Sequence, residues 1–199
     1  MRVCILGNGL SALTLAKALV NQNISVDIVS VKKKHSINPS RTIGISKSNY
    51  DYFNKNIINI KKIIWKLKKI EIYSENLKNE KILNFENNSD QLFSILKNND
   101  IYKILYKSLS NNKYCKKIKF KKNLFNVNEY NLIINTDYMN VFAKKFFSRK
   151  IVKVYNSLAY TTIINHQQIK NNKAIQIFTK FGPLAFLPIS KNKTSIVYS

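Results

Sequence analysis

The first thirty residues constrain the fold of this chain more than any other part of its sequence. A short apolar run at residues 3–6 ends at Gly7-Asn8-Gly9, and an apolar pattern with a period near 3.6 residues follows as far as Val20. A second β-branched run then occupies residues 24–29. This order of strand, glycine turn, helix and strand predicts a βαβ unit, and with it an α/β fold of the Rossmann type.

The glycine turn predicts a dinucleotide-binding site, although a strand and helix that bind nothing are the simpler alternative. Gly7 permits the tight turn, Gly9 lets the backbone approach a pyrophosphate, and Ala12 replaces the usual third glycine. The helix that starts beyond Gly9 offers free N–H groups to a phosphate. Ser30 stands where such sites usually carry an acid for the ribose hydroxyls. Because Lys32–Lys34 follows at once, a cofactor with a 2′-phosphate is a further alternative.

The charge of the chain is strongly basic, with 34 lysine and arginine residues against 10 acidic ones and a formal net charge of +24. Such a charge ordinarily suggests nucleic acid. Lysine, however, is spread over most of the chain together with many Asn, Ile, Tyr and Phe residues, and no nucleic-acid-binding signature accompanies it. We therefore expect no nucleic-acid partner, with DNA binding by the basic surface as the weakest alternative. The same surface would attract the protein to anionic lipid.

Neither a metal site nor a catalytic side chain is predicted. Cys4 and Cys115 lack the spacing of metal or redox pairs, which favours free thiols in a reducing compartment, and His35 and His166 are interpreted as solvated residues. No apolar run reaches the roughly 18 residues of a membrane helix. We expect a cytoplasmic protein, either soluble or peripheral on the inner face of the membrane.

The rest of the chain alternates between strand and helix patterns. The patterns predict a strand at 41–46, a helix from 48 towards 58, a three-stranded meander at 69–73, 82–85 and 92–96, and a helix from Asn99. Residues 116–122 suit either a hairpin strand or a basic loop. A strand at 130–137 would place Asp137 at the carboxyl edge of the sheet. β-rich runs at 152–165, 174–180, 184–189 and 194–198 predict a final sheet of consecutive strands.

The most specific signal lies near the end of the chain. Residues 178–189, FTKFGPLAFLPI, followed by SIVY at 195–198, resemble a motif of the FAD-dependent hydroxylases of ubiquinone biosynthesis, which are relatives of p-hydroxybenzoate hydroxylase. The glycine turn, residues 41–46 and residues 98–105 match this family in the same order. The resemblance covers essentially all 199 residues, which correspond to about the first half of a typical member. We expect a truncated chain that ends in mid-strand.

The resemblance implies roles for particular residues. Gly7, Gly9 and Ala12 would form the turn over the FAD pyrophosphate, while Arg41 would lie along the flavin side and Asn98 would reach the cofactor from a helix start. Asp137 matches the Asp of an internal Asp-Gly motif near FAD and the nicotinamide donor. From the residues alone, the alternatives are an ordinary surface arginine for Arg41 and, on equal terms with the site role, a cap of the next segment for Asp137.

Three positions depart from the family pattern. Ser30 replaces the acidic ribose ligand, Tyr138 replaces the glycine of the Asp-Gly motif, and Val141 stands where a serine is usual. These departures, together with the early end of the chain, favour the alternative of a non-catalytic nucleotide- or partner-binding remnant.

The resemblance also implies an activity and a domain organisation. NAD(P)H would reduce FAD, and O2 would then be used to hydroxylate an aromatic ring that carries a polyprenyl tail, so the substrate is lipid-like and other subunits of a biosynthetic complex are candidate partners. Residues 1–148 would form the FAD-binding domain, with the meander inserted at about 66–97, and residues 149–199 the first strands of a substrate domain.

Overall fold

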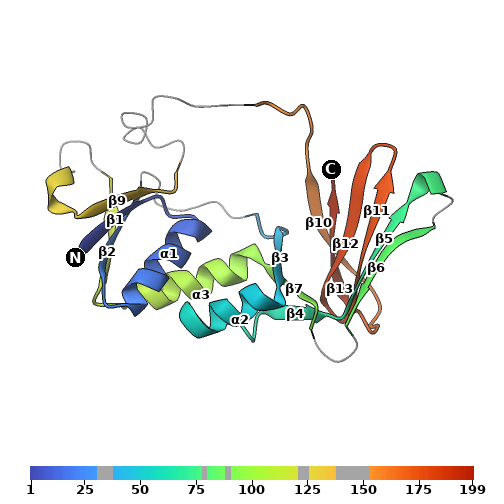
Figure 1. Cartoon of the computed structure of the whole chain (residues 1–199), viewed down its shortest axis with the longest axis horizontal. Coiled ribbons are helices and arrows are strands. Elements are labelled where there is room, and N and C mark those ends of the chain that lie inside the picture. Colours follow the sequence, from blue (N-terminus) through green and yellow to red (C-terminus); the bar gives the residue numbers. More distant parts are fainter. Residues whose placement is uncertain (31–37, 78–79, 88–90, 121–125, 138–152) are drawn as a thin grey trace. The chain divides into compact units, whose positions relative to one another are not determined.

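A computed structural model describes residues 1–30, 38–77, 80–87, 91–120, 126–137 and 153–199 (Figure 1). The chain divides into two compact units. The first comprises Met1–Ser36, Lys55–Ile58 and Ile101–Lys153, and the second comprises Ile37–Asn54, Asn59–Asp100 and Val154–Ser199. None of the helices in the described ranges is both long and apolar enough to cross a membrane.

The first unit is built on a parallel sheet with the strand order β8-β2-β1-β9. Its strands are β1 (Arg2–Leu6), β2 (Ser25–Ser30), β8 (Cys115–Lys119) and β9 (Leu132–Asn135). Helix α1 (Leu10–Asn21) connects β1 to β2 and buries Ala12, Leu13, Ala16 and Val20. The predicted α/β fold with a βαβ unit at the N-terminus is confirmed.

Strand β8 corrects the prediction of a hairpin strand or basic loop at residues 116–122. It lies parallel to β2, and the pairing is extended at both ends, where Val26 N donates to Tyr114 O at 2.8 Å and Phe120 N donates to Ser30 O at 2.9 Å. Ile118 packs against the core formed by Cys4, Leu6 and Val29. Packing against this core gives a lysine-rich strand a place in the sheet that its composition does not reveal.

Helix α3 (Asn98–Ser110) precedes β8 in the chain. Ile101, Leu105 and Leu109 are buried along one face, which confirms the helix predicted from their spacing. The helix begins at Asn98, one residue before the predicted start at Asn99.

The second unit contains two sheets. One has the order β3-β7-β4 and is antiparallel, with the strands β3 (Thr42–Ser46), β7 (Phe93–Lys97) and β4 (Ile64–Leu67). Helix α2 (Lys47–Asn56) follows β3, as predicted. Leu67, Ile95 and Ala174 form the buried core of this unit, and Trp65 and Leu187 pack against it.

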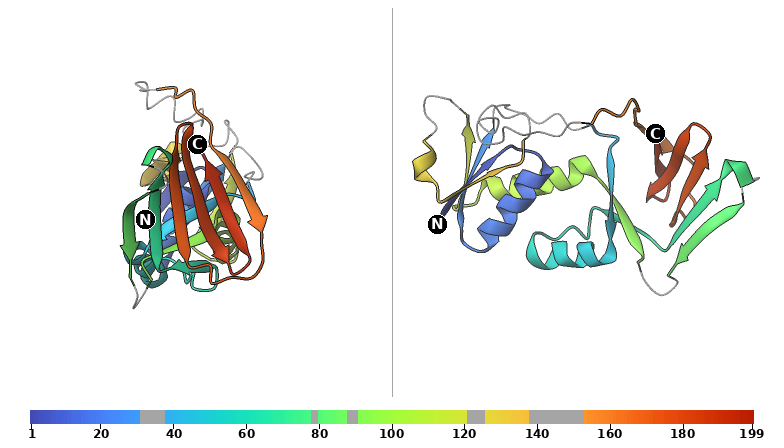
Figure 2. Two further views of the ribbon diagram at one scale, coloured as in Figure 1. Left: turned by 90° about the vertical axis from the view of Figure 1, so that its right-hand side faces the viewer. Right: turned by 45° about the horizontal axis from the view of Figure 1, so that its top comes forward.

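The other sheet has six strands in the order β10-β13-β12-β11-β5-β6 (Figure 2). They are β10 (Tyr160–Asn165), β13 (Lys193–Tyr198), β12 (Gly182–Ser190), β11 (Lys173–Thr179), β5 (Lys69–Ser74) and β6 (Lys81–Glu86). All neighbours are antiparallel except β11 and β5, which run parallel. The short helix η1 (Glu75–Leu77) follows β5, and the similar η3 (Val127–Glu129) precedes β9.

Two predictions about this unit are corrected. The prediction of a third meander strand at 92–96 is wrong: β5 and β6 form a hairpin, but β7 pairs with β3 and β4 in the other sheet. β6 is therefore an edge strand of the six-stranded sheet, and the second neighbour of β5 is β11 from the final strands. Of the β-rich run predicted at 152–165, residues 153–165 are described, and within them the strand covers Tyr160–Asn165. The predicted domain boundary at 148/149 lies outside the described residues, and the domain division stays a prediction.

Candidate functional site

The carboxyl edge of the parallel sheet gathers most of the predicted site residues. All four strands run in the same direction, so the residues after their ends meet at one edge. The chain order also reverses at β1, since β2 lies on one side of it and β9 on the other. Open α/β sheets bind ligands outside the carboxyl ends of their strands at such a reversal. Gly7, Ser30, Lys119 and Asp137 all lie at or directly after these ends.

Gly7 adopts a backbone conformation that side chains rarely tolerate, with φ at +121°. Its N–H donates to Val29 O at 2.8 Å. A Cβ at this position would collide with Thr136 Oγ1 and would lie 3.3 Å from the Cβ of Asp137. The predicted tight turn at Gly7 is therefore confirmed, and its cause is the close approach of the chain after β9. Contact between Gly7 and a cofactor stays a prediction.

Gly9 and Ala12 form the start of α1. Gly9 is the N-cap, with φ at −77°, and its carbonyl accepts the first helical hydrogen bond from Leu13 N at 3.0 Å. Gly9 has no side chain to cap the first amides, and the first turn carries no acidic residue. Ala12 is fully buried, as expected for the small residue of the motif. The helix end therefore presents N–H groups and a positive dipole end, which suit an anion.

A pocket of about 170 Å³ lies at the same edge and is named here the Ser30 pocket. It is lined by residues of β1–α1, β2, α3 and β8: Asn8, Leu13, Ile28, Ser30, Tyr102, Tyr106, Lys117, Ile118 and Lys119. In the sheet register Ser30 is the direct neighbour of Lys119, and Ile28 is the neighbour of Lys117. No carboxylate is among the described residues that line it. The pocket is therefore basic at the position where an acid is usual.

Two tyrosines form an aromatic wall of the Ser30 pocket. The rings of Tyr102 and Tyr106 stack with their centroids 5.9 Å apart and their planes 17° apart. Lys117 Nζ lies 3.2 Å from the centroid of the Tyr106 ring and donates to Tyr106 O at 3.1 Å and to Ser110 Oγ at 2.5 Å. Burial lowers the pKa of Lys117 and raises that of Tyr102. Lys117 thus lies against the wall through these contacts, and both Lys117 and Lys119 are exposed.

Arg41 and Asn98 belong to the second unit, where the structure brings them together. Asn98 N donates to Arg41 O at 3.0 Å, and the side chain of Arg41 is exposed. The Oδ1 atom of Asn98 is buried and has no hydrogen-bond partner among the described residues. A buried acceptor without a donor is costly, so this atom is suited to a ligand that donates a hydrogen bond.

The other residues considered in the sequence have structural surroundings. Asp137 N donates to Asn135 Oδ1 at 3.2 Å, directly after β9. Burial raises the pKa of the Cys4 thiol to about 12, so this cysteine is not a nucleophile. His166 is half-buried and contacts Thr194 Oγ1 at 3.0 Å, which corrects its interpretation as a solvated residue. Lys32–Lys34, His35, Tyr138 and Val141 lie outside the described residues.

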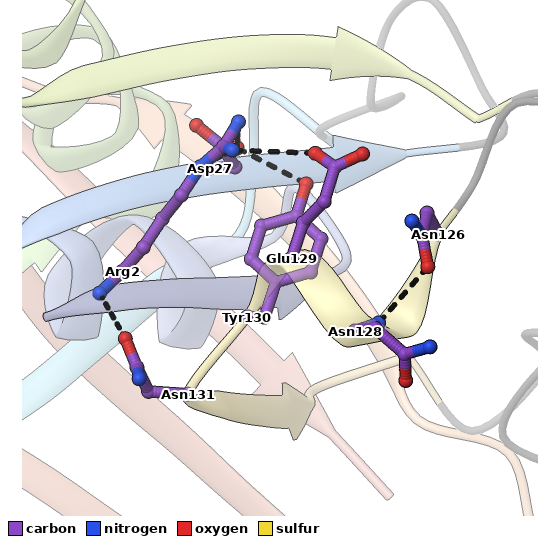
Figure 3. A network of polar contacts seen from close by, with 7 residues as sticks. All are labelled: Arg2, Asp27, Asn126, Asn128, Glu129, Tyr130 and Asn131. Atoms are coloured by element: carbon purple, nitrogen blue, oxygen red, sulfur yellow. Dashed lines mark hydrogen bonds and ion pairs between the residues drawn. The ribbon is translucent and has the colours of Figure 1, made fainter.

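A buried carboxylate that the sequence analysis did not single out lies at the opposite edge of the sheet (Figure 3). Asp27 Oδ2 accepts hydrogen bonds from Arg2 Nη2 at 2.7 Å, Arg2 Nε at 3.0 Å and Tyr130 Oη at 3.0 Å. Arg2 also reaches Glu129 at 3.3 Å, and its backbone N–H donates to Asn131 Oδ1 at 2.8 Å. Burial and the hydrogen bond to Asp27 raise the pKa of Tyr130. These contacts link β1, β2 and the segment directly before β9, so the network is structural.

The Ser30 pocket contains four residues that sequence reasoning missed: Tyr102, Tyr106, Lys117 and Lys119. Two weak signals were present. The tyrosines are four residues apart on a helix, so they share a face, and the lysines are two apart on a strand, so they share a side. Neither signal indicates a site until β8 is placed beside β2.

Comparisons with known proteins give structural but not sequence matches. No protein-family model and no curated protein matches the sequence. PqsL from Pseudomonas aeruginosa, described as a probable FAD-dependent monooxygenase, is similar with a TM-score of 0.73 at 11% identity, covering 99% of this chain and 59% of that one. 2,6-Dihydroxypyridine-3-hydroxylase from Arthrobacter nicotinovorans is similar with a TM-score of 0.70 at 15% identity, covering 99% of this chain and 56% of that one. 2-Methyl-3-hydroxypyridine-5-carboxylic acid oxygenase is similar with a TM-score of 0.74 at 11% identity, covering 98% of this chain and 57% of that one.

These matches establish the fold. Nearly the whole chain superimposes on these proteins, and its parallel βαβ sheet shares their α/β fold. The chain spans about three fifths of the length of PqsL.

Proposed function

We propose that this chain is the FAD-binding part of an FAD-dependent aromatic monooxygenase. The observation that carries this proposal is the similarity of 99% of the chain to PqsL, a probable FAD-dependent monooxygenase, combined with the glycine turn at the carboxyl edge of the sheet. Two solved structures of pyridine-ring oxygenases with the same fold support the aromatic substrate class.

Each unit, taken by itself, offers residues that suit a part of FAD. At the sheet edge, Gly7 permits the tight turn after β1, and α1, which begins after the N-cap Gly9, offers its amides to the pyrophosphate. In the second unit, the buried Oδ1 of Asn98 would accept a hydrogen bond from the cofactor, and Arg41 would provide a positive charge beside it. Ser30 would contact the ribose through a hydroxyl instead of a carboxylate, and Asp137 would lie near the turn.

When bound, the flavin would supply the redox chemistry with NAD(P)H and O2, while the protein would bind, orient and exclude water. Because the flavin would supply the chemistry, the reaction needs no side-chain nucleophile. The finer proposal is a polyprenylated aromatic ring of ubiquinone biosynthesis as the substrate. It is supported by the family-like motif, whose two halves lie on neighbouring strands, with Leu184 opposite Tyr198 and Ala185 opposite Val197. The six-stranded sheet would form the wall on the substrate side.

Titration of the purified chain with FAD, followed by flavin fluorescence and absorbance, tests this proposal. We expect one FAD per chain and weaker binding by Arg41→Ala. Arg41 makes its described hydrogen bonds through the backbone, to Asn38 O and from Asn98 N, so this variant removes only the side-chain charge. Lys66→Ala, at an exposed position of β4, is the matched control for loss of one charge. No FAD binding by the wild-type chain, or equal effects of the two variants, would contradict the proposal.

A non-catalytic nucleotide- or partner-binding module is the second candidate function. It is favoured by Ser30, because a hydroxyl holds ribose less strongly than a carboxylate. This candidate predicts that FAD binds without any NAD(P)H oxidation, even when a segment equivalent to the rest of PqsL is supplied. Substrate-dependent NAD(P)H oxidation by such an assembly would rule it out.

A further inference from the structure

The Ser30 pocket differs in charge from the ribose site of an FAD-binding sheet. Where that site uses a carboxylate to accept hydrogen bonds from ribose hydroxyls, this chain has Ser30 with Lys119 as its neighbour in register. Neighbouring strands are about 4.8 Å apart, so these two side chains lie within reach of one small ligand group. Lys117, two residues earlier on β8, adds a second positive charge on the same side.

This set of groups suits an anion and not a pair of neutral hydroxyls. A serine hydroxyl donates to phosphate oxygen, and a lysine ammonium is a compact charge that commonly binds phosphate. No carboxylate is among the described lining residues, so none of these residues compensates the charges of the two lysines, which line the pocket and are exposed. Lys117 is already engaged with Tyr106 O and Ser110 Oγ, so Lys119 is the group available for direct contact.

We propose that the Ser30 pocket binds an adenine nucleotide through a phosphate monoester on its ribose, with Ser30 and Lys119 as the phosphate ligands. The Tyr102–Tyr106 wall would provide an aromatic surface for the adenine. A volume of about 170 Å³ suits one end of a dinucleotide, since pockets for whole drug-sized ligands measure roughly 300–1,000 Å³. Because the pocket adjoins the glycine turn, such a nucleotide would compete with FAD, a consequence that rests on the proposed function.

Isothermal titration with two adenosine nucleotides tests the pocket directly. Adenosine 2′,5′-bisphosphate and adenosine 5′-diphosphate each carry two phosphates, but only the first has one on the ribose 2′ position. We expect the bisphosphate to bind at least about tenfold more tightly, which corresponds to about one charge-assisted contact. Adenosine 3′,5′-bisphosphate then shows whether the 2′ or the 3′ position is recognised.

Variants at neighbouring positions of one strand provide the matched control. Lys119→Gln should abolish the preference for the bisphosphate, whereas Lys116→Gln should preserve it, because Lys116 lines a different pocket at the opposite edge. Both side chains are exposed, so neither variant removes core packing. Ser30→Asp should reverse the preference, since a carboxylate repels the added phosphate and accepts from free ribose hydroxyls.

Competition with FAD separates this inference from the proposed function. Displacement of FAD by the bisphosphate, but not by the diphosphate at the same concentration, supports both. A clear preference for the bisphosphate without any FAD binding keeps the inference and overturns the proposed function. Equal affinity for the two nucleotides, or equal effects of Lys119→Gln and Lys116→Gln, would mean attraction by net charge alone and overturn the inference.

Discussion

At the scale of single residues, the turn after β1 depends on the absence of one side chain. Gly7 has φ at +121°, and the space that its Cβ would need is occupied by Thr136 Oγ1. Thr136 is itself held in place, because its hydroxyl donates to Leu6 O at 2.8 Å. The same glycine therefore satisfies a backbone requirement and a packing requirement, whether or not a cofactor is bound.

Gly7→Ala is expected to destabilise the protein by about 1–3 kcal/mol, because it adds both backbone strain and a collision. The midpoint of urea denaturation measures this change. Gly9→Ala is the matched control, since Gly9 has an ordinary φ of −77°, and it should cost less than about 1 kcal/mol. Thr136→Ala removes the atom that the new Cβ would meet, so Gly7→Ala should cost less stability in the Thr136→Ala background than in the wild-type chain. Equal effects of the two glycine variants would show that φ at Gly7 is unimportant.

At the scale of elements, one buried carboxylate links three strands of the six-stranded sheet. Glu71 on β5 is 2% exposed and accepts from Lys81 Nζ of β6 at 2.6 Å and from Lys173 Nζ of β11 at 2.7 Å. Tyr73 Oη donates to it at 3.0 Å, and Lys69 Nζ lies 3.4 Å away. The hydrogen bonds from Lys173 and Lys81 lower the pKa of Glu71 to about 2. This group joins the hairpin β5–β6 to the final strands.

The stability of the six-stranded sheet should fall as the pH is lowered from about 4.5 to about 2. Between these pH values Glu71 is protonated in the unfolded chain but stays ionised in the folded chain. The contribution of Glu71 to the free energy of unfolding is therefore complete above pH 4.5 and is lost as the pH falls towards 2. Glu71→Gln should cost roughly 1–3 kcal/mol at neutral pH and should flatten this dependence. Thermal denaturation between pH 2 and pH 7 measures both effects. Glu80→Gln, at an exposed position, is the control. If it flattened the pH dependence of stability as much as Glu71→Gln does, Glu71 would not be the cause of that dependence.

At the scale of the whole molecule, the net charge of +24 is the dominant physical property. Self-repulsion of this size opposes aggregation and attracts anionic surfaces. Because the proposed substrate carries a lipid-like tail, we propose that this charge brings the protein to anionic membranes. Each lysine near such a surface contributes on the order of 1 kcal/mol, and the attraction decays within a Debye length.

Co-sedimentation with phospholipid vesicles tests this proposal. We expect binding to vesicles that contain anionic lipid at low ionic strength, release at high salt, and no binding to neutral vesicles. Equal binding to neutral and anionic vesicles would point to apolar contacts instead, and no binding at low salt would remove the proposal.

Much of the local structure follows from the sequence alone. The order β1–α1–β2, the turn at Gly7, the apolar face of α3 and a final sheet of consecutive strands were all predicted, because each depends on side-chain periodicity or backbone freedom within a few tens of residues. The glycine turn and Ser30 were also found as candidate residues at this level. These features need no information about distant parts of the chain.

The pairing of distant strands was decided only by the tertiary structure. β8 lies beside β2 and β11 beside β5, and these neighbours bring Lys119 to Ser30 and Lys173 to Glu71. A lysine-rich strand has no local pattern that specifies its partner, because its place depends on which core its few apolar residues can cover. The charge of the Ser30 pocket is therefore a property of the folded sheet and not of any single segment.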